Sequence, residues 1–148
     1  MFVVVTGGSG SGKSEFSEDL LQKLDEKKHL SGKISRFYIA TMFPFDEESH
    51  MRIARHRKMR KDKVFSTIEC YTGLKNLKLP SEGEEKPSVL LECMSNLTAN
   101  EIYREDGAGK KAPEEIIKGI RSLLEQTENL VVVTNEVFSD GIQYDEST

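Results

Sequence analysis

The feature that most constrains the fold is a glycine loop near the start of the chain. Residues 7–14 read Gly-Gly-Ser-Gly-Ser-Gly-Lys-Ser, directly after a β-branched run at residues 2–6 and directly before an amphipathic stretch. They satisfy the pattern Gly-x-x-x-x-Gly-Lys-Ser in full, with a strand expected before the loop and a helix after it. The sequence therefore predicts a P-loop. The alternative is a glycine-rich turn that only connects strand to helix, but such a turn does not need the lysine and serine at these positions.

A P-loop is suited to hold the phosphates of a nucleotide. Its glycines let backbone N–H groups turn inward and approach the phosphates closely. The lysine supplies a positive charge to the β- and γ-phosphates, the serine offers a hydroxyl to Mg²⁺, and the helix N-terminus adds partial positive charge. The predicted nucleotide-binding residues of the loop are Gly7, Gly8, Ser9, Gly10, Ser11, Gly12, Lys13 and Ser14, with Ser14 also a metal ligand.

Size and charge limit the other classes of function. The chain has 148 residues, of which 36% are hydrophobic, and this favours a single core. A formal net charge of −4 argues against general nucleic-acid binding. No apolar run approaches the ~20 residues that cross a bilayer. Cys70 and Cys93 indicate neither a disulfide framework nor a zinc site. We expect one cytoplasmic P-loop domain over residues 1–148.

Short apolar runs alternate with amphipathic stretches along the chain. Strands are predicted at 2–6, 34–40, 64–70, 89–91 and 130–134, and all but the short third one are expected to be buried. Helices are predicted at 13–27, at 46–60 and from Pro113 onward, with a helical turn at 73–79 and a loop at 106–112. The residues expected on the inward helix faces are Phe16, Leu20, Leu21, Leu24, Ile116, Ile117, Ile120 and Leu124. The alternation predicts an α/β fold, a mostly parallel sheet with helices on both faces.

An acidic residue follows the third buried strand. Glu92 comes directly after Val-Leu-Leu at 89–91. P-loop proteins usually place a carboxylate at the end of a second buried strand, where it serves the metal or a water molecule. Strand C-termini in such sheets line the ligand crevice, which favours Glu92 as a metal ligand. The alternative is a carboxylate that is merely solvated at the sheet edge.

A strongly basic segment carries a histidine. Residues 50–63 contain seven arginines and lysines against one aspartate. Three interpretations are open: a solvated helix face, a nucleic-acid patch, or a phosphate clamp around His56. Arg52, His56 and Arg60 are spaced four apart and share one helix face. A neutral imidazole there is able to attack phosphorus as a nucleophile. The acidic remainder of the chain weakens the nucleic-acid interpretation.

Several segments, in order, resemble one family. They are the loop at 7–14, Tyr-Ile-Ala-Thr at 38–41, Asp-Glu-Glu at 46–48, Arg-Ile-Ala-Arg-His-Arg at 52–57, Thr-Ile-Glu at 67–69, Leu-Leu-Glu-Cys at 90–93, Asn100, and Val-Thr-Asn-Glu-Val at 133–137. Together they resemble the bifunctional adenosylcobinamide kinase/adenosylcobinamide-phosphate guanylyltransferases of cobalamin biosynthesis. The P-loop alone is generic, whereas the other segments at these spacings are more specific.

The resemblance implies two reactions. A nucleoside triphosphate, GTP or possibly ATP, phosphorylates adenosylcobinamide, and GTP then transfers GMP to that phosphate through a guanylyl-histidine. The resemblance implies His56 and Lys13 as catalytic residues, Mg²⁺ as cofactor and a homotrimer as the assembly. It also implies nucleotide contacts from Ala40, Thr41, Met42, Arg57, Lys58, Met59, Glu69 and Glu92. The two carboxylates suit guanine, whose N1–H and N2–H₂ groups are donors.

The chain departs from the family pattern near its end. Residues 138–141 replace a glycine-rich segment, and the chain stops at Thr148, where the family adds a helical segment and a closing strand. We therefore expect the C-terminal part of the family domain to be missing. Two rival interpretations remain. A simple small-molecule P-loop kinase would leave His56 without a role, and a nucleotide-binding protein that has lost catalysis would bind GTP without turnover.

Overall fold

A computed structural model describes residues 1–8, 11–27, 35–43, 47, 50, 51, 53, 54, 65–80 and 85–135 of the chain. Its centre is a sheet of five parallel strands in the order β1-β5-β4-β2-β3. The strands are β1 (Phe2–Gly7), β2 (Arg36–Ala40), β3 (Ser66–Glu69), β4 (Ser88–Glu92) and β5 (Leu130–Asn135). The predicted parallel sheet is confirmed, because every strand pairing is parallel. Each connection therefore returns from the carboxyl end of one strand to the amino end of the next.

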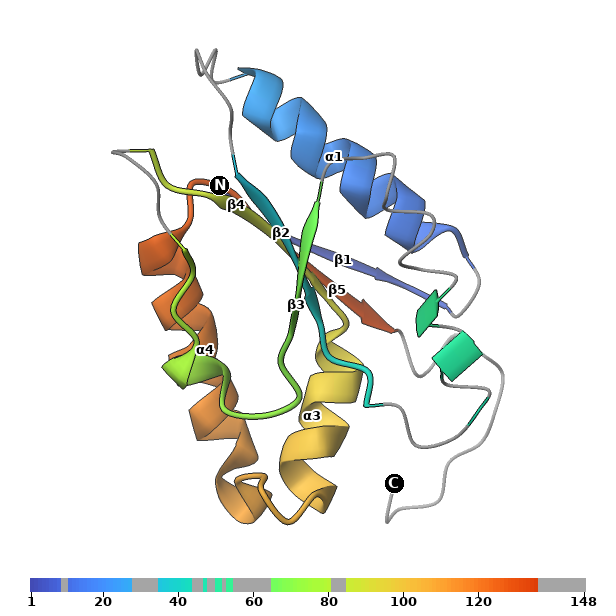
Figure 1. Ribbon diagram of the computed structural model, residues 1–148, viewed down its shortest axis with the longest axis vertical. Helices are drawn as coiled ribbons and strands as arrows, with labels where there is room; N and C mark the ends of the chain where they lie inside the picture. Colours follow the sequence, from blue (N-terminus) through green and yellow to red (C-terminus); the bar gives the residue numbers. More distant parts are fainter. Residues whose placement is uncertain are drawn as a thin grey trace.

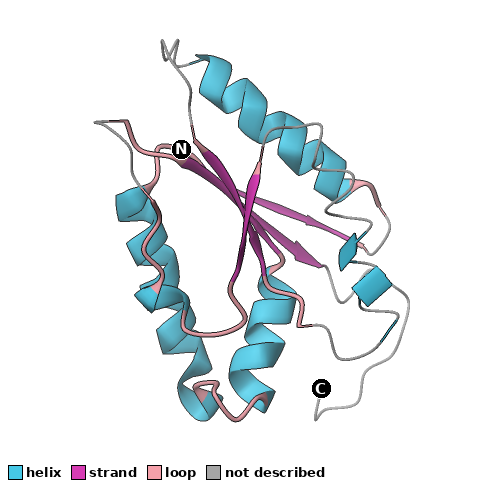
Figure 2. Ribbon diagram, viewed as in Figure 1, coloured by secondary structure: helices cyan, strands magenta, loops and turns pink. Residues whose placement is uncertain are grey.

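Helices cover both faces of the sheet (Figure 1). Helix α1 (Lys13–Lys27) lies on one face, and α3 (Met94–Tyr103) and α4 (Ala112–Gln126) lie on the other. Two short 3₁₀ turns, η2 (Leu74–Asn76) and η3 (Gly109–Lys111), connect elements on the side of α3 and α4. Figure 2 shows the three layers by their colours, with the strands between the helices. The predicted α/β fold with helices on both faces is therefore confirmed.

Alternate residues of each strand serve the two faces. In β2, Phe37 and Ile39 pack with the core beneath α3 and α4, whereas Tyr38 and Ala40 pack with the core beneath α1. Successive side chains of a strand point to opposite faces, so this division follows from the period of two. Residues in register with Ala40 therefore face the same side of the sheet as α1 and the glycine loop.

The buried carboxylate of Asp25 joins α1 to the edge of the sheet where the strands begin. Asp25 is 1% exposed and accepts hydrogen bonds from Arg36 Nε at 2.7 Å, Ser88 Oγ at 2.5 Å and Asn129 Nδ2 at 2.8 Å. The donors stand at the first residue of β2, the first residue of β4 and just before β5. A buried carboxylate needs such partners, and here three elements supply them.

The prediction that the first strand is buried is wrong for its alternate residues. Phe2 and Val4 are 45% and 54% exposed. Among the described strands, β1 pairs with β5 alone and lies at the edge of the sheet. The side chains of Val3 and Val5 still pack partly against the core beneath α1. An edge strand thus has the apolar composition of a buried strand here. For this reason the composition of residues 2–6 predicted burial on both faces.

Two helix faces are also shifted from their predicted positions. The packed face of α1 contains Ser17, Leu21, Leu24 and Asp25, while Phe16 is 59% exposed. The packed face of α4 centres on Gly119 and Leu123, with Ile117 and Leu124 exposed at 52% and 39%. Phe16 and Leu124 lie about 100° around the helix axis from the buried residues Ser17 and Leu123. Small or polar residues at the true centre, Ser17 and Gly119, hid it from the hydrophobic pattern.

The sequence analysis missed α3 altogether. Its buried residues are Leu97, Asn100 and Glu101, so only one of the three is apolar. Its N-cap is Cys93, whose sulfur accepts from the backbone N–H of Asn96 at 3.4 Å, in place of the usual oxygen-bearing residue. Neither helical periodicity nor a capping signal was therefore available. Most of the helix predicted at 46–60 lies outside the described residues.

Candidate active site

The predicted site residues gather at the edge where the parallel strands end. β1 ends at Gly7, β2 at Ala40, β3 at Glu69 and β4 at Glu92. Ligands of open parallel sheets bind outside the carboxyl ends of the strands, because loops and helix N-termini converge there. Residues far apart in the sequence are thereby placed on one surface.

The glycine loop connects β1 to α1. Gly12 has φ 82°, a left-handed conformation that favours glycine. A Cβ added to Gly7 would lie 2.9 Å from Ser11 Oγ, so a larger residue there would crowd the loop. Lys13 Nζ donates to the carbonyl oxygen of Gly8 at 3.0 Å, across the mouth of the loop. Ser9 and Gly10 lie outside the described residues.

The first turn of α1 reaches the end of β4. Ser14 Oγ donates a hydrogen bond to Glu92 Oε1, and Tyr38 OH donates to Glu92 Oε2. Among the described residues Glu92 has no ion-pair partner, in contrast to Asp25, which pairs with Arg36 at 2.7 Å. Two neutral hydroxyls therefore hold the carboxylate of Glu92, one of them from the serine of the glycine loop.

Glu69 and Glu92 flank Ala40 in the register of the sheet. Ala40 pairs with Glu69 on β3 and with Glu92 on β4. Adjacent strands are about 5 Å apart, so the two glutamate backbones are about 10 Å apart, with the smallest side chain between them. All three residues face α1, because register partners in a parallel sheet point the same way. Glu69 is exposed, and Glu92 is half-buried.

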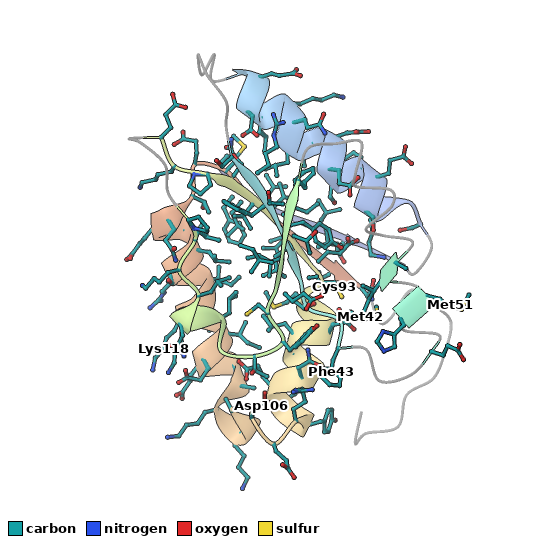
Figure 3. The ribbon with its side chains drawn as sticks, in the orientation of Figure 1. Met42, Phe43, Met51, Cys93, Asp106 and Lys118 are labelled. Carbon is teal, nitrogen blue, oxygen red and sulfur yellow. The ribbon has the colours of Figure 1, made fainter. Side chains whose placement is uncertain are left out.

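A second network fixes the loop that leaves β2. Thr41 Oγ1 donates to the carbonyl oxygen of Cys93 at 2.8 Å and accepts from the N–H of Cys93 at 2.9 Å. The side chain of Asn100, 4% exposed, donates from Nδ2 to the Thr41 carbonyl at 2.7 Å. Figure 3 shows Met42 near Cys93, the N-cap residue of α3. Of the predicted contacts Ala40, Thr41 and Met42, Thr41 is thus held by three hydrogen bonds.

An aromatic cluster forms beside the segment that follows β2. The guanidinium of Arg104 lies 4.0 Å from the centre of the Phe43 ring, and Phe43 meets Tyr71 edge to face at 5.2 Å. Arg104 also pairs with Asp106 at 2.9 Å. The cluster attaches the segments after β2 and β3 to the end of α3, and cation–π contacts of this kind stabilise such junctions.

Both cysteines are buried thiols beside the site. Burial, with the charge of Glu101 as a smaller cause, raises the pKa of Cys70 to about 11. Burial is also the main cause that raises the pKa of Cys93 above its ordinary value, with Glu92 adding to it. Neither thiol is therefore ionised near neutral pH, and neither has the lowered pKa of a nucleophilic cysteine.

The predicted nucleophile, His56, is not among the described residues. His56, Arg57, Lys58 and Met59 all lie outside the described residues, as does most of the basic segment. Their roles stay predictions that rest on the sequence. Only neighbouring residues such as Met51 and Ala54 are described, and both are exposed.

The structure adds two residues that the sequence analysis named only as parts of family segments. Tyr38 holds Glu92, and Asn100 holds Thr41. A tyrosine inside an otherwise apolar strand was the available signal, because a buried hydroxyl needs a partner. Nothing in the sequence indicated which carboxylate it would meet, since that depends on the strand order.

The donor set suits Mg²⁺ bound together with a triphosphate. The described residues contain no group of three or more His, Cys, Asp or Glu that could hold a metal by itself. Mg²⁺ usually keeps several waters and takes one or two protein ligands in addition to substrate phosphates. One hydroxyl and one carboxylate, Ser14 and Glu92, fit that requirement.

Comparison with known proteins identifies the family. The sequence matches the family described as cobinamide kinase / cobinamide phosphate guanyltransferase over residues 3–148. The chain belongs to this family. It is therefore, by family, a kinase and guanylyltransferase of cobalamin biosynthesis, and the resemblance drawn from its segments is confirmed.

Two curated relatives of the cobinamide kinase family share this match. The chain is 33% identical to the bifunctional adenosylcobalamin biosynthesis protein CobU of Escherichia coli over 150 residues, which cover 93% of this chain and 76% of that protein. It is 30% identical to the protein of the same name from Salmonella typhimurium over 103 residues, 70% of this chain and 51% of that protein. The matched region thus spans about half of the Salmonella protein. No helix in the described part of the chain is long and apolar enough to cross a membrane.

Proposed function

We propose that this chain binds GTP at the glycine loop and catalyses both reactions implied by its family. In the first, the hydroxyl of adenosylcobinamide attacks the γ-phosphorus of GTP or ATP, and the nucleoside diphosphate leaves. In the second, GMP passes from GTP to adenosylcobinamide phosphate. The observation that carries the proposal is the hydrogen bond from Ser14 to Glu92, which joins the glycine loop to the end of β4.

The described residues would divide the work of phosphate binding. Backbone N–H groups of the loop and the N-terminus of α1 bind phosphate oxygens. Lys13, which now donates to Gly8, is free of any carboxylate partner in the described part of the chain and is positioned to turn to the β- and γ-phosphates. Ser14 and Glu92 would hold Mg²⁺, which supplies charge neutralisation at the triphosphate. The carboxylate of Glu69, at the end of β3, offers acceptors to the guanine edge.

We propose His56 as the nucleophile of the second reaction. A ring nitrogen of the neutral imidazole attacks the α-phosphorus, the bond to the bridging oxygen breaks and pyrophosphate leaves. An oxygen of the corrinoid phosphate then attacks the same phosphorus and breaks the N–P bond. Splitting one transfer into two displacements is the advantage of covalent catalysis. Arg57 and Lys58, next to His56 in the sequence, would stabilise the charge that develops.

Incubation with [α-³²P]GTP and Mg²⁺ tests this function. We expect label on the protein that is lost in acid and kept in base, because a phosphoramidate has this stability whereas an ester to serine does not. The variant His56→Asn should take up no label and should still bind GTP, because the glycine loop belongs to a separate element. Label on His56→Asn would assign the nucleophile to another residue.

The Escherichia coli relative, run in parallel, interprets a negative result. If the homologue is labelled and this chain binds GTP without label, the chain is a nucleotide-binding protein without transfer activity. If GTP supports phosphorylation of adenosylcobinamide but never labels the protein, the chain acts as a kinase alone.

We further propose that the protein is a homotrimer in the cytoplasm. Sedimentation equilibrium would test the trimer.

A further inference from the structure

The carboxylate of Glu92 has its two oxygens committed in different directions. Oε1 accepts from Ser14, at the start of α1 in the glycine loop. Oε2 accepts from Tyr38, whose side chain belongs to the core beneath α1 and is 4% exposed. One oxygen is thus turned toward the phosphates and the other toward the interior of the protein.

The register of β2 and β4 places Tyr38 for this contact. Tyr38 pairs with Leu90, and Ala40 pairs with Glu92. Glu92 is two residues beyond Leu90, so its side chain lies diagonally across from Tyr38 on the same face. Diagonal neighbours in a sheet are about 7–8 Å apart at Cα, a distance that an aromatic ring and a glutamate side chain can close together. Ala40, between them in position, is too small to block the contact.

The hydroxyl is not needed for the core by itself. A phenylalanine at position 38 would bury the same ring without a polar atom, and a buried hydroxyl is costly unless it is paired. The Tyr38 hydroxyl donates its hydrogen bond to Glu92 Oε2. A tyrosine that pairs with the one half-buried carboxylate at the end of β4 acts on the orientation of that carboxylate.

We propose that Tyr38 is a positioning residue of the nucleotide site, an inference that rests on the proposed function. Its hydroxyl prevents rotation of the Glu92 carboxylate, so that Oε1 stays directed at Ser14 and at the cation bound with the triphosphate. The Ser14 hydroxyl is able to donate its proton to Oε1 while its oxygen lone pairs face the cation.

The same geometry assigns the two glutamates different ligands. To accept N1–H and N2–H₂ of guanine side by side, a carboxylate must turn both oxygens toward the base. Glu92 has one oxygen fixed toward the protein interior by Tyr38. Glu92 therefore serves the metal, and recognition of the base falls to Glu69, the other glutamate in register with Ala40.

The dissociation constant of GTP, measured with Mg²⁺ and again with EDTA, tests the role of Tyr38. Wild-type protein should bind more tightly with Mg²⁺. Tyr38→Phe should reduce this Mg²⁺-dependent gain about tenfold or more, tenfold being near the lower end of the range for loss of one hydrogen bond to a charged group. The constant in EDTA should stay unchanged. A reduced folded fraction raises the apparent dissociation constants in Mg²⁺ and in EDTA by the same factor, so their ratio stays valid for a partly unfolded variant.

Two controls separate positioning from a structural effect. Tyr103→Phe removes a hydroxyl from a side chain that is 81% exposed and should leave the Mg²⁺ gain at the wild-type value. In a Glu92→Gln background, Tyr38→Phe should cause no further loss, because the two residues act as one unit. A purely structural hydroxyl would lower the unfolding temperature and leave the Mg²⁺ gain unchanged.

The outcomes are distinguishable from failure of the proposed function. If wild-type protein does not bind GTP, the proposed function and this inference are both overturned. If wild-type protein binds GTP and Tyr38→Phe keeps the full Mg²⁺ gain, only the inference is overturned. If Tyr38→Phe weakens binding equally in Mg²⁺ and in EDTA, Tyr38 shapes the site without positioning the carboxylate, and the inference is likewise wrong.

Discussion

Asp25 and Glu92 are two acidic side chains that join α1 to the parallel sheet. Asp25 lies at the edge where the strands begin, and Glu92 lies at the edge where they end. Asp25, at the C-terminal end of α1, is 1% exposed and accepts from an arginine, a serine and an asparagine. Within the described part of the chain, Glu92 accepts only from the hydroxyls of Ser14 and Tyr38, and it is half-buried. The negative charge of Asp25 is balanced by a guanidinium, whereas that of Glu92 has no cation among the described residues.

This difference separates a structural carboxylate from a functional one. A buried charge that is fully paired contributes to the fold and has no capacity left for a ligand. A carboxylate held by neutral donors is oriented but still attracts a cation. We therefore expect changes at the two edges to act on different quantities, namely the free energy of unfolding at the Asp25 edge and nucleotide binding at the Glu92 edge.

The largest effect should come from Asp25→Ala. The substitution leaves Arg36, Ser88 and Asn129 without their common acceptor, and it should lower the free energy of unfolding by about 3–4 kcal/mol. Urea denaturation measures this loss. Glu26→Ala, at the adjacent exposed position, is the matched control and should change stability by less than about 0.5 kcal/mol. A loss of GTP affinity in folded Asp25→Ala protein would contradict the division between the edges.

Lys13→Ala should show the opposite pattern. Loss of its charge at the phosphates should weaken GTP binding about a hundredfold, equivalent to about 2.7 kcal/mol, and should remove both activities. Its stability should hardly change, because in the described part of the chain the side chain donates only to the Gly8 carbonyl. Isothermal titration with GTP and urea denaturation of the same sample test both parts. Unchanged affinity in a folded variant would contradict the assignment of the glycine loop.

Glu69→Gln sharpens the comparison within the functional edge. The change replaces one acceptor by a donor, so the preference for GTP over ATP should fall about tenfold. Competition of ATP against bound GTP measures this preference. Glu92→Gln should reduce the Mg²⁺ dependence of binding and leave the nucleotide preference near the wild-type value. If Glu92→Gln instead abolished the preference, the two glutamates would have exchanged roles.

The smallest effect concerns Cys70, which lies at the functional edge but resembles Asp25 in its burial. Its pKa in the folded protein is about 11, above the reference value of 9.0. The unfolded chain therefore loses this proton first as the pH rises, and the stability linked to Cys70 decreases between about pH 9 and 11. Urea denaturation over this range should be less pH-dependent for Cys70→Ala than for wild-type protein. Equal slopes would show that the thiol ionises alike in both states.

The sequence predicted well wherever function requires particular residue types at fixed spacing. The glycine loop, the strand before it and the helix after it are of this kind, and so is the sequence of strands that ends at Glu92. The bounds of α1 were predicted at the observed residues Lys13 and Lys27. The family segments were also readable, because short runs such as 38–41 and 90–93 keep their order along the chain.

What the sequence did not predict depends on which strands become neighbours. The row Glu69–Ala40–Glu92 requires β2 to lie between β3 and β4, and no local pattern reveals that order. The contact of Tyr38 with Glu92 has the same origin. Helix α3 was missed because its buried face contains Asn100 and Glu101, whose partners are a backbone carbonyl of another segment and backbone N–H groups. The role of His56 stays a prediction.

The pairing of β1 with β5 also constrains how the protein acquires its site during synthesis. Phe2 pairs with Leu130 and Gly7 with Asn135, so the strand that carries the glycine loop joins the sheet through partners nearly the whole length of the chain away. Contacts of such sequence separation form late and slow folding, because the intervening chain must be ordered first. A nascent chain lacking β5 therefore contains every residue of the loop without the support that shapes it. Nucleotide would then bind only after translation has passed β5, as a ligand of the finished sheet.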